Sequence, residues 1–422
     1  MFLIIRLKNY FHQFSRNARL FLLATIISGI AYSGLQLFFN IYLRSRNFDL
    51  DFIGLINAIP AGAALVVGVP MGMLSDRIGR RRAMLIGLAF STGAAWGMVN
   101  APSREVMLVM ACFKGIADSL YMLSQAPFMM RAAGEKERTL LFSLNFGLTT
   151  ISGAVGNLLA GQLPAWFGRW LGVGPENPLA YQSVLTATVL CGGLSLVPVW
   201  LIREIKWPGP RREPPVGLED FRKLLRPSVL RLAAPNFIIS CGAAILIPYM
   251  NLFFKGRFAV PDGQLGVLFS LSAGLTGVAT VIGPSIAARL NSKIKAVVFT
   301  QAASLFFLLL MGFVPSFWVA GGSFLLRAAL MNMASPLYSA FAMENTVERE
   351  RGAVNSVMSL MWEVGWTVGP YFSGVVQARW GFGPLFVLTS ILYAIAIALT
   401  WQFFHRTEAE ARLAAELALS AK

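Results

Sequence analysis

Twelve apolar segments recur along this chain, and each is long enough to cross about 30 Å of hydrocarbon as a helix. They lie near residues 18–43, 52–74, 83–99, 105–130, 139–165, 180–202, 229–254, 264–288, 295–314, 316–342, 352–378 and 383–404. Hydrophobic residues make up 56% of the chain and charged residues only 13%, a balance that excludes a water-soluble globule. We therefore predict an all-α membrane protein with twelve transmembrane helices.

Basic residues are distributed unevenly between the two sides of this predicted bundle. Most of the 36 Lys and Arg residues fall in the segments that share a side with the N-terminus. Cytoplasmic loops carry such an excess, so we predict a multi-pass protein of the cell (inner) membrane with both termini cytoplasmic. The net charge of +16 therefore indicates topology and contact with anionic lipid, and we expect no nucleic acid partner.

The two halves of the chain repeat one another. Asn40 matches Asn251 and Gly156 matches Gly369, at an offset of about 212 residues. Two six-helix copies in the same orientation are related by an axis along the membrane normal, and the proline-rich, charged stretch between them is typical of a linker. The predicted parts are an N-terminal interfacial helix (1–17), two six-helix bundles (18–202 and 229–404), a cytoplasmic linker (203–228) and a cytoplasmic tail (405–422).

A short basic turn lies between the second and third predicted helices. It reads Gly72-Met-Leu-Ser-Asp76-Arg77-Ile-Gly79-Arg80 and continues with two further arginines. A generic basic loop would explain the arginines, but not the spaced glycines and the single acid. The turn resembles the loop 2–3 signature of the major facilitator superfamily, and together with the repeat this resemblance covers nearly the whole chain. It implies a secondary transporter with twelve helices in two six-helix pseudo-repeats, working by alternating access.

The resemblance also implies gating roles for this turn and for span 11. The loop aspartate, here Asp76, would rest against the cytoplasmic start of span 11, where an acid at a helix N-terminus is favoured. Gly369 and Pro370 would let span 11 pack closely and bend. The family's antiporter signature has Gly-Pro in span 5, whereas this chain has Gly156-Asn157, which weakens the inference of antiport.

Four charged residues lie about 15 Å deep in the predicted helices, where an unpaired charge costs several kcal/mol. Lys114 and Asp118 in span 4 are four residues apart and can neutralise one another. Arg327 in span 10 is the repeat counterpart of Lys114, and Glu363 in span 11 is its nearest acid by depth. Either pair can take part in transport or can serve only as a structural ion pair.

Polar side chains follow one face of spans 1, 4, 7 and 10, which line the central cavity in the family that this chain resembles. We therefore predict a water-filled cavity and a substrate-binding set on these four spans. Its members are Lys114, Arg327, Tyr32, Gln36, Asn40, Tyr121, Gln125, Asn236, Asn251 and Tyr338.

Glu363 is the first predicted residue for proton coupling, and Asp118 is the second. Glu363 lies between Trp362 and Trp366, and a carboxyl group in an apolar, aromatic setting can carry a proton near neutral pH. When ionised it would pair with Arg327, and when protonated it would release Arg327 to an anionic substrate. A permanent Arg327–Glu363 salt bridge is the alternative.

We expect a secondary active transporter that couples protons to the movement of a small organic or amphiphilic molecule. The chain has no Gly-x-x-x-x-Gly-Lys motif, so ATP is not the expected energy source. Its two histidines, His12 and His405, lie near the membrane ends, and we expect no metal, no cofactor and no enzyme activity. The expected partners of a monomer are a small-molecule substrate, protons and the lipid bilayer.

Export is favoured over uptake because adaptable side chains such as Phe38, Tyr121, Met331 and Trp362 flank the polar positions. The alternatives are proton-coupled uptake of a small organic anion or sugar-like solute, and a lipid flippase. A membrane enzyme or a sensor on the same fold is the rival from another class, and it would need clustered acid–base residues or a larger soluble domain.

Overall fold

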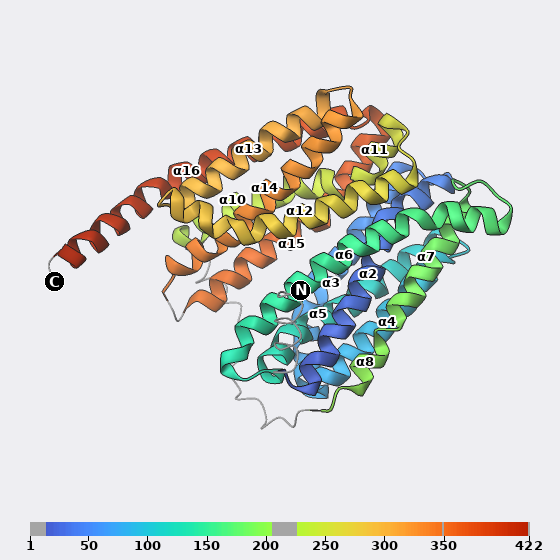
Figure 1. Cartoon of the computed structure of the whole chain (residues 1–422), viewed down its shortest axis with the longest axis horizontal. Helices are drawn as coiled ribbons and strands as arrows, with labels where there is room; N and C mark the ends of the chain where they lie inside the picture. Colours follow the sequence, from blue (N-terminus) through green and yellow to red (C-terminus); the bar gives the residue numbers. More distant parts are fainter. Residues whose placement is uncertain (1–13, 205–225, 348–349, 421–422) are drawn as a thin grey trace, which may run out of the picture. The chain divides into compact units, whose positions relative to one another are not determined.

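The computed structural model describes residues 14–204, 226–347 and 350–420, and these ranges contain helices and no strand (Figure 1). The predicted interfacial helix and linker fall mostly outside the described residues. The first half comprises α2 (Arg16–Ser45), α3 (Leu50–Ile78), α4 (Arg80–Val99), α5 (Arg104–Ala132), α6 (Glu135–Leu171), α7 (Pro178–Gly193) and α8 (Leu196–Leu201). The second half comprises α10 (Pro227–Leu246), η1 (Ile247–Tyr249), α11 (Met250–Phe258), α12 (Asp262–Arg289), α13 (Lys293–Phe313), α14 (Phe317–Glu344), α15 (Arg351–Trp380) and α16 (Gly383–Ser420).

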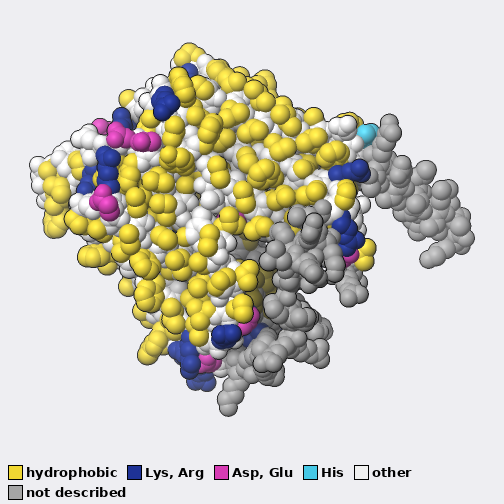
Figure 2. Space-filling view, turned by 180° about the vertical axis from the view of Figure 1, so that it is seen from behind, with side chains coloured by type: hydrophobic (Ala, Val, Ile, Leu, Met, Phe, Trp, Pro, Cys, Tyr) yellow, Lys and Arg dark blue, Asp and Glu magenta, His cyan; other side chains and the backbone are white. Residues whose placement is uncertain are grey.

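These helices match the twelve predicted spans one for one, which confirms the predicted fold class. With α7 joined to α8 and α10 joined to α11, 11 of them are long and apolar enough to cross a membrane. The remaining helix, α15, has 30 residues, but Asn355, Ser356 and Glu363 lower its hydropathy. Figure 2 shows apolar side chains over most of one face of the molecule, with charged side chains gathered toward the margins.

Two predicted spans are interrupted, and a proline lies at or just after each interruption. The seventh span breaks at η1, which contains Pro248, and the sixth breaks between α7 and α8, four residues before Pro198. A proline has no N–H to donate to the carbonyl four residues earlier, so regular helix does not continue through it unchanged.

The chain forms two compact units. Unit 1 is Met1–Glu213 with Asn251–Ala273, and unit 2 is Pro214–Met250 with Gly274–Lys422. Unit 1 therefore contains all of α11 after Met250 and the first part of α12, which belong to the second half of the sequence. The domain boundaries derived from the sequence stay a prediction.

The same helix pairs touch in both halves. In the first half α2 lies against α6 and α7, and α4 lies against α5 and α7. In the second half α10 lies against α15 and α16, and α13 lies against α14 and α16. In each half the first helix therefore packs on the fifth and sixth, and the third packs on the fourth and sixth, as an internal repeat requires.

Glycines lie where the paired helices approach most closely. A Cβ on Gly156 of α6 would lie 2.5 Å from the carbonyl oxygen of Ile30 in α2. Its repeat counterpart, Gly369 of α15, would place a Cβ 2.6 Å from the Cβ of Ala244 in α10. Missing side chains let the backbones approach, and close van der Waals contact holds helices together in lipid, where the hydrophobic effect between helices is weak.

Gly115 makes the tightest of these contacts to backbone atoms, between α5 and α3. A Cβ at this position would lie 2.2 Å from the carbonyl oxygen of Pro60 and 2.6 Å from its Cα. Because backbone cannot move aside as a flexible side chain does, this contact fixes the rotation of α5 about its own axis. The contact therefore also fixes where the neighbouring Lys114 projects.

We predict that Gly115→Ala destabilises unit 1 by about 1–3 kcal/mol, the usual cost of overpacking a tight contact. The measurement is the midpoint of thermal unfolding of the purified protein in detergent. Gly153→Ala on α6 is the matched control, because nothing lies within 4 Å of the Cβ that it adds. A Gly115→Ala protein as stable as the control would show that this contact does not constrain α5.

Candidate functional site

Lys114 and Asp118 form an ion pair one turn apart on α5. The Lys114 side chain is mostly buried, whereas that of Asp118 is 34% exposed. The hydroxyl of Ser91 in α4 donates to the other carboxylate oxygen of Asp118. A buried cation is thus neutralised by an acid that is partly exposed.

Three more of the predicted binding residues surround this pair. Tyr32 of α2 is exposed, interacts electrostatically with Lys114, and accepts a hydrogen bond from the side-chain amide of Gln36. Tyr121 of α5 interacts with Asp118 and with Ser28 of α2. The structure therefore brings five predicted site residues together in unit 1: Tyr32, Gln36, Lys114, Asp118 and Tyr121. We call this group the Lys114 site.

The two matching asparagines have protein partners instead. Asn40 is buried, and its side-chain oxygen accepts a hydrogen bond from Asn57 of α3 at 2.9 Å. Asn251 is buried too, and its amide donates to the carbonyl oxygen of Leu37 at 2.8 Å, which ties α11 to α2. Gln125 is half-buried further along α5. Asn40 and Asn251 therefore hold helices together in this structure.

Arg327 of unit 2 is buried in a different way from its repeat counterpart. It is 4% exposed, and its guanidinium interacts with Tyr393 of α16. Its backbone carbonyl accepts a hydrogen bond from Ser304 of α13 at 3.0 Å. Glu363 is exposed, and no ion pair joins it to Arg327 within the part of the chain that the structure describes. The neighbour of the Arg327 guanidinium is thus Tyr393 of α16, and the expected pair with Glu363 does not form in this structure.

The other predicted residues of unit 2 differ in how deeply their side chains are buried. Tyr338 is buried, and its hydroxyl donates to the carbonyl oxygen of Leu232 in α10 at 2.7 Å. Asn236 is half-buried on α10. Gly369 contacts α10, and the carbonyl of Pro370 accepts a hydrogen bond from Tyr249 at 2.7 Å, so this part of α15 is held firmly against the seventh span.

The basic turn between α3 and α4 is a single residue long. Gly79 has a φ of 90°, a conformation that other residues rarely adopt, and it ends α3 and begins α4. Asp76 forms an ion pair with Arg80, which also donates to Ser75 at 2.7 Å. Gly72 has open space around it.

Arg77 is exposed on the last turn of α3. The described side-chain contacts of the turn from Gly72 to Arg80 are therefore those of Asp76 and Arg80. Ser75 in turn hydrogen-bonds Ser124 of α5 at 2.6 Å. The motif is therefore connected, through two serines, to the helix that carries the Lys114 site.

A second charged cluster, which sequence reasoning missed, lies at the end of unit 1 opposite the Gly79 turn. Asp262, at the start of α12, forms an ion pair with Lys255 of α11 and accepts a hydrogen bond from the hydroxyl of Tyr181 in α7 at 3.0 Å. Lys255 also lies 3.1 Å from a carboxylate oxygen of Glu176. The side chain of Asp262 is 7% exposed. We call these four residues the Asp262 cluster.

The Asp262 cluster fixes the start of α12 against the first six spans. Nearby, Gly161 of α6 and Gly266 of α12 touch, since a Cβ on Gly161 would lie 2.8 Å from the Cα of Gly266. The repeat offered a signal for this cluster, because Lys255 and Asp262 correspond to Arg44 and Asp51. The signal was incomplete, since Asp51 is exposed and accepts from the backbone N–H of Phe52.

A sequence model of the Major Facilitator Superfamily matches residues 21–363 and 232–419 of this chain. The multidrug resistance protein MdtG of Enterobacter lignolyticus (strain SCF1) is 23% identical over 410 residues, which cover 94% of this chain and 94% of that protein.

Solved structures show the same fold. A bacterial homolog of the human lysosomal transporter Spinster, inward-facing and unoccupied, has a TM-score of 0.75 at 15% identity and covers 91% of this chain and 95% of its own. A mutant of the nucleoside transporter NupG has a TM-score of 0.71 at 12% identity and covers 92% of this chain and 99% of its own. At such identities the likeness shows the fold alone.

We predict that Asp262→Asn loosens the attachment of residues 251–273 to the rest of unit 1. The substitution removes the ion pair and leaves Lys255, which is mostly buried, with the more distant Glu176. Amide hydrogen exchange in these residues should rise about tenfold, equivalent to about 1.4 kcal/mol of local opening free energy.

Asp51→Asn is the matched control for this experiment, because it changes the repeat-equivalent acid, which is exposed. It should leave exchange in both halves unchanged. Equal exchange in the Asp262→Asn and Asp51→Asn proteins would mean that the glycine contact, and not the cluster, holds α12.

Proposed function

The chain belongs to the Major Facilitator Superfamily, a family of membrane transporters for small molecules, and on this basis we propose that it is a proton-coupled secondary exporter of a small organic or amphiphilic molecule. As a member of this family it is a multi-pass membrane transporter and not an enzyme. We place it in the cell's inner membrane as a monomer with both termini cytoplasmic, in keeping with the excess of basic residues on that side.

The Lys114 site is the observation that carries this proposal. A substrate with an anionic group needs a cation, and Lys114 supplies one next to two aromatic rings that suit an amphiphilic body. Lys114 is occupied by Asp118 while Asp118 is ionised. Protonation of Asp118 removes that attraction and frees Lys114 for an anionic group. A cationic group of the substrate would instead compete with the proton for Asp118, and this competition is the linkage that exchange in opposite directions requires.

This linkage replaces the one that we expected at Arg327. Competition between Glu363 and a substrate for Arg327 has no support from the geometry, since Arg327 interacts with Tyr393. Competition between Asp118 and a substrate for Lys114 uses an ion pair that does form. A coupling of about 1–3 kcal/mol is typical of two sites linked in this way.

Glu363 is the second proposed proton-binding residue. It is exposed and lies on α15 six residues before Gly369, where the helix packs on α10 and contains Pro370. A change of charge at Glu363 would act on a helix in which Pro370 leaves one backbone hydrogen bond unmade. Its proposed effect is on the bending of α15 and does not involve Arg327.

Alternating access requires each end of the transporter to open in turn, and two features of unit 1 suit this role. The motif around Asp76 and Arg80 lies at one end, and the Asp262 cluster lies at the other. We propose that both ends close through contacts that charged side chains can make and break, with Gly72, Arg77 and Gly79 completing the motif.

We infer the direction of transport from the similarity to MdtG and not from the geometry of the Lys114 site. MdtG is named as a multidrug resistance protein, and we take its name as support for export of more than one compound. We expected Phe38 to flank the polar positions of the cavity. It is fully buried and packs against Tyr181, so it does not line a binding site. The alternatives are uptake of an organic anion or sugar-like solute, and lipid flipping. The experiment below distinguishes them from export.

The test uses the full-length protein in proteoliposomes with an imposed pH gradient. Cationic dyes, small organic anions, a sugar and a fluorescent phospholipid are the probes. We expect the wild-type protein to accumulate a cationic dye on the side from which protons flow. Movement with the protons, or movement of the phospholipid or sugar only, would contradict export.

We predict that Asp118→Asn loses accumulation driven by the gradient, because Asn can neither bind a proton nor change its charge. The internal to external concentration ratio should fall to about one, the value without coupling. Glu105→Gln, an exposed acid in the first turn of the same helix, is the control and should accumulate substrate normally.

Glu363→Gln separates the two proposed proton sites. If Asp118→Asn still concentrates substrate and Glu363→Gln does not, Glu363 is the coupling residue and the Lys114 site is structural. If both variants concentrate substrate normally, transport is not coupled to protons through either acid. Because Asp118→Asn leaves a buried lysine unpaired, the midpoint of thermal unfolding of the purified variant checks that a loss of accumulation is not a loss of folding.

A further inference from the structure

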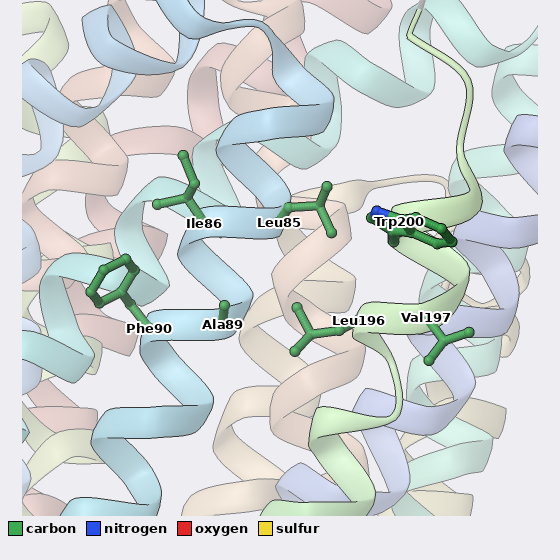
Figure 3. A pocket seen from close by; sticks show the side chains of 7 residues that line it. All are labelled: Leu85, Ile86, Ala89, Phe90, Leu196, Val197 and Trp200. Atoms are coloured by element: carbon green, nitrogen blue, oxygen red, sulfur yellow. The ribbon is translucent and has the colours of Figure 1, made fainter.

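A groove of about 510 Å³ lies between α4 and α8 on the surface of unit 1 (Figure 3). The wall on the α8 side exists because the sixth span is interrupted. Pro198 has no N–H for the carbonyl of Leu194, and Val197 donates to that carbonyl instead at 3.1 Å. The chain restarts as α8, from which Leu196 points toward α4, and Trp200 lies one turn further along α8 (Figure 3). We call this feature the α4–α8 groove.

The wall on the α4 side is a continuous apolar face. Leu85 and Ala89 are one turn apart, and Ile86 and Phe90 form the adjacent row. Phe90 is 66% exposed and Trp200 is 64% exposed, so these large rings cover no protein core within the described residues. In a membrane-spanning bundle such a face is covered by hydrocarbon chains.

Two arginines lie at one end of the groove, one turn before Leu85 and Ile86. Arg81 donates through Nη2 to the carbonyl oxygen of Trp200 at 2.6 Å, and its buried Nε has no hydrogen-bond partner within the described part of the chain. The side chain of Arg82 is 65% exposed, and its nearest carboxylate is that of Glu204, 3.7 Å away. Within the described residues, the two cations thus have one acid, Glu204, in ion-pair contact, through Arg82.

We propose that the α4–α8 groove binds an anionic phospholipid, with an acyl chain along the two apolar walls and the phosphate at Arg81 and Arg82. Guanidinium groups match phosphate oxygens in geometry as well as charge. The positive-inside rule places this basic end at the membrane surface, at the depth of a lipid headgroup. The site is separate from the proposed transport function and does not depend on it.

A lipid fits these features better than a protein partner does. The groove is lined throughout by apolar side chains and continues the lipid-facing surface of the spanning helices, while charge appears at one end only. This is the distribution of a phospholipid, apolar along its length and charged at its head. The lipid would also cover Leu196 and Trp200 of α8, and its binding should therefore stabilise the end of the sixth span.

The test measures lipid retention by native mass spectrometry of the full-length protein in detergent. Phosphatidylglycerol and phosphatidylcholine with identical acyl chains are the probes, offered together. We expect phosphatidylglycerol to be retained about tenfold more strongly, equivalent to about 1.4 kcal/mol of binding free energy. Phosphatidylglycerol carrying a photoreactive acyl chain should label peptides containing Phe90 or Trp200.

Two variants test the two halves of the site separately. Arg82→Gln removes an exposed cation, and Ala89→Trp fills the groove without changing its charge. Each should lower phosphatidylglycerol retention about tenfold, equivalent to the same 1.4 kcal/mol. Arg231→Gln on α10 and Ala302→Trp on α13 are the matched controls at exposed positions outside the groove, and both should retain the lipid as the wild type does.

Several results would overturn the proposal. These are equal retention of the two lipids, unchanged retention in both groove variants, labelling confined to other helices, or a co-purified protein cross-linked at Trp200 in place of lipid. Should Ala89→Trp fail to fold, Arg82→Gln and the labelling experiment still decide, because an exposed arginine is not needed for packing.

Discussion

Charged groups in the spanning helices of this protein must be neutralised or reached by water, because an unpaired charge in hydrocarbon costs several kcal/mol. Lys114 is neutralised by Asp118 and Lys255 by Asp262. The surroundings of both pairs depend on helices being held at one rotation and one depth, which glycine contacts such as that between Gly115 of α5 and α3 provide. Close helix packing and charge neutralisation therefore depend on one another, and a substitution that disturbs one is expected to disturb the other.

The internal repeat and the charge pairs follow different rules. The repeat is preserved in the contacts between helices, since Gly156 and Gly369 serve the same purpose in α6 and α15. It is not preserved in chemistry. Lys114 has an acid one turn away, whereas its counterpart Arg327 is buried beside Tyr393. A transporter built from two similar halves can thus keep a symmetric scaffold and still place its proposed substrate and proton sites in one half.

Much of the Lys114 site could be predicted, because its members lie on regular helices with fixed spacing. Residues four apart share a face, so the sequence alone paired Lys114 with Asp118, and it grouped Tyr32 with Gln36. Predictions failed where the partner lies on another helix. Depth along the membrane matched Arg327 with Glu363, but depth does not report the direction in which a side chain turns. Phe38 likewise looked like a wall of the cavity and is packed against Tyr181.

The amino-acid sequence by itself determined the number of spans, the repeat, the family and the pairs within one helix, because hydropathy and spacing are properties of the chain alone. Only the tertiary structure decided which equivalent residues are used. Asp51 and Asp262 begin matching helices, yet only Asp262 is buried, because α12 packs on α6 at Gly161 and brings Tyr181 and Lys255 around it. The environment of a side chain depends on contacts from distant segments, and no local pattern in the sequence records those contacts.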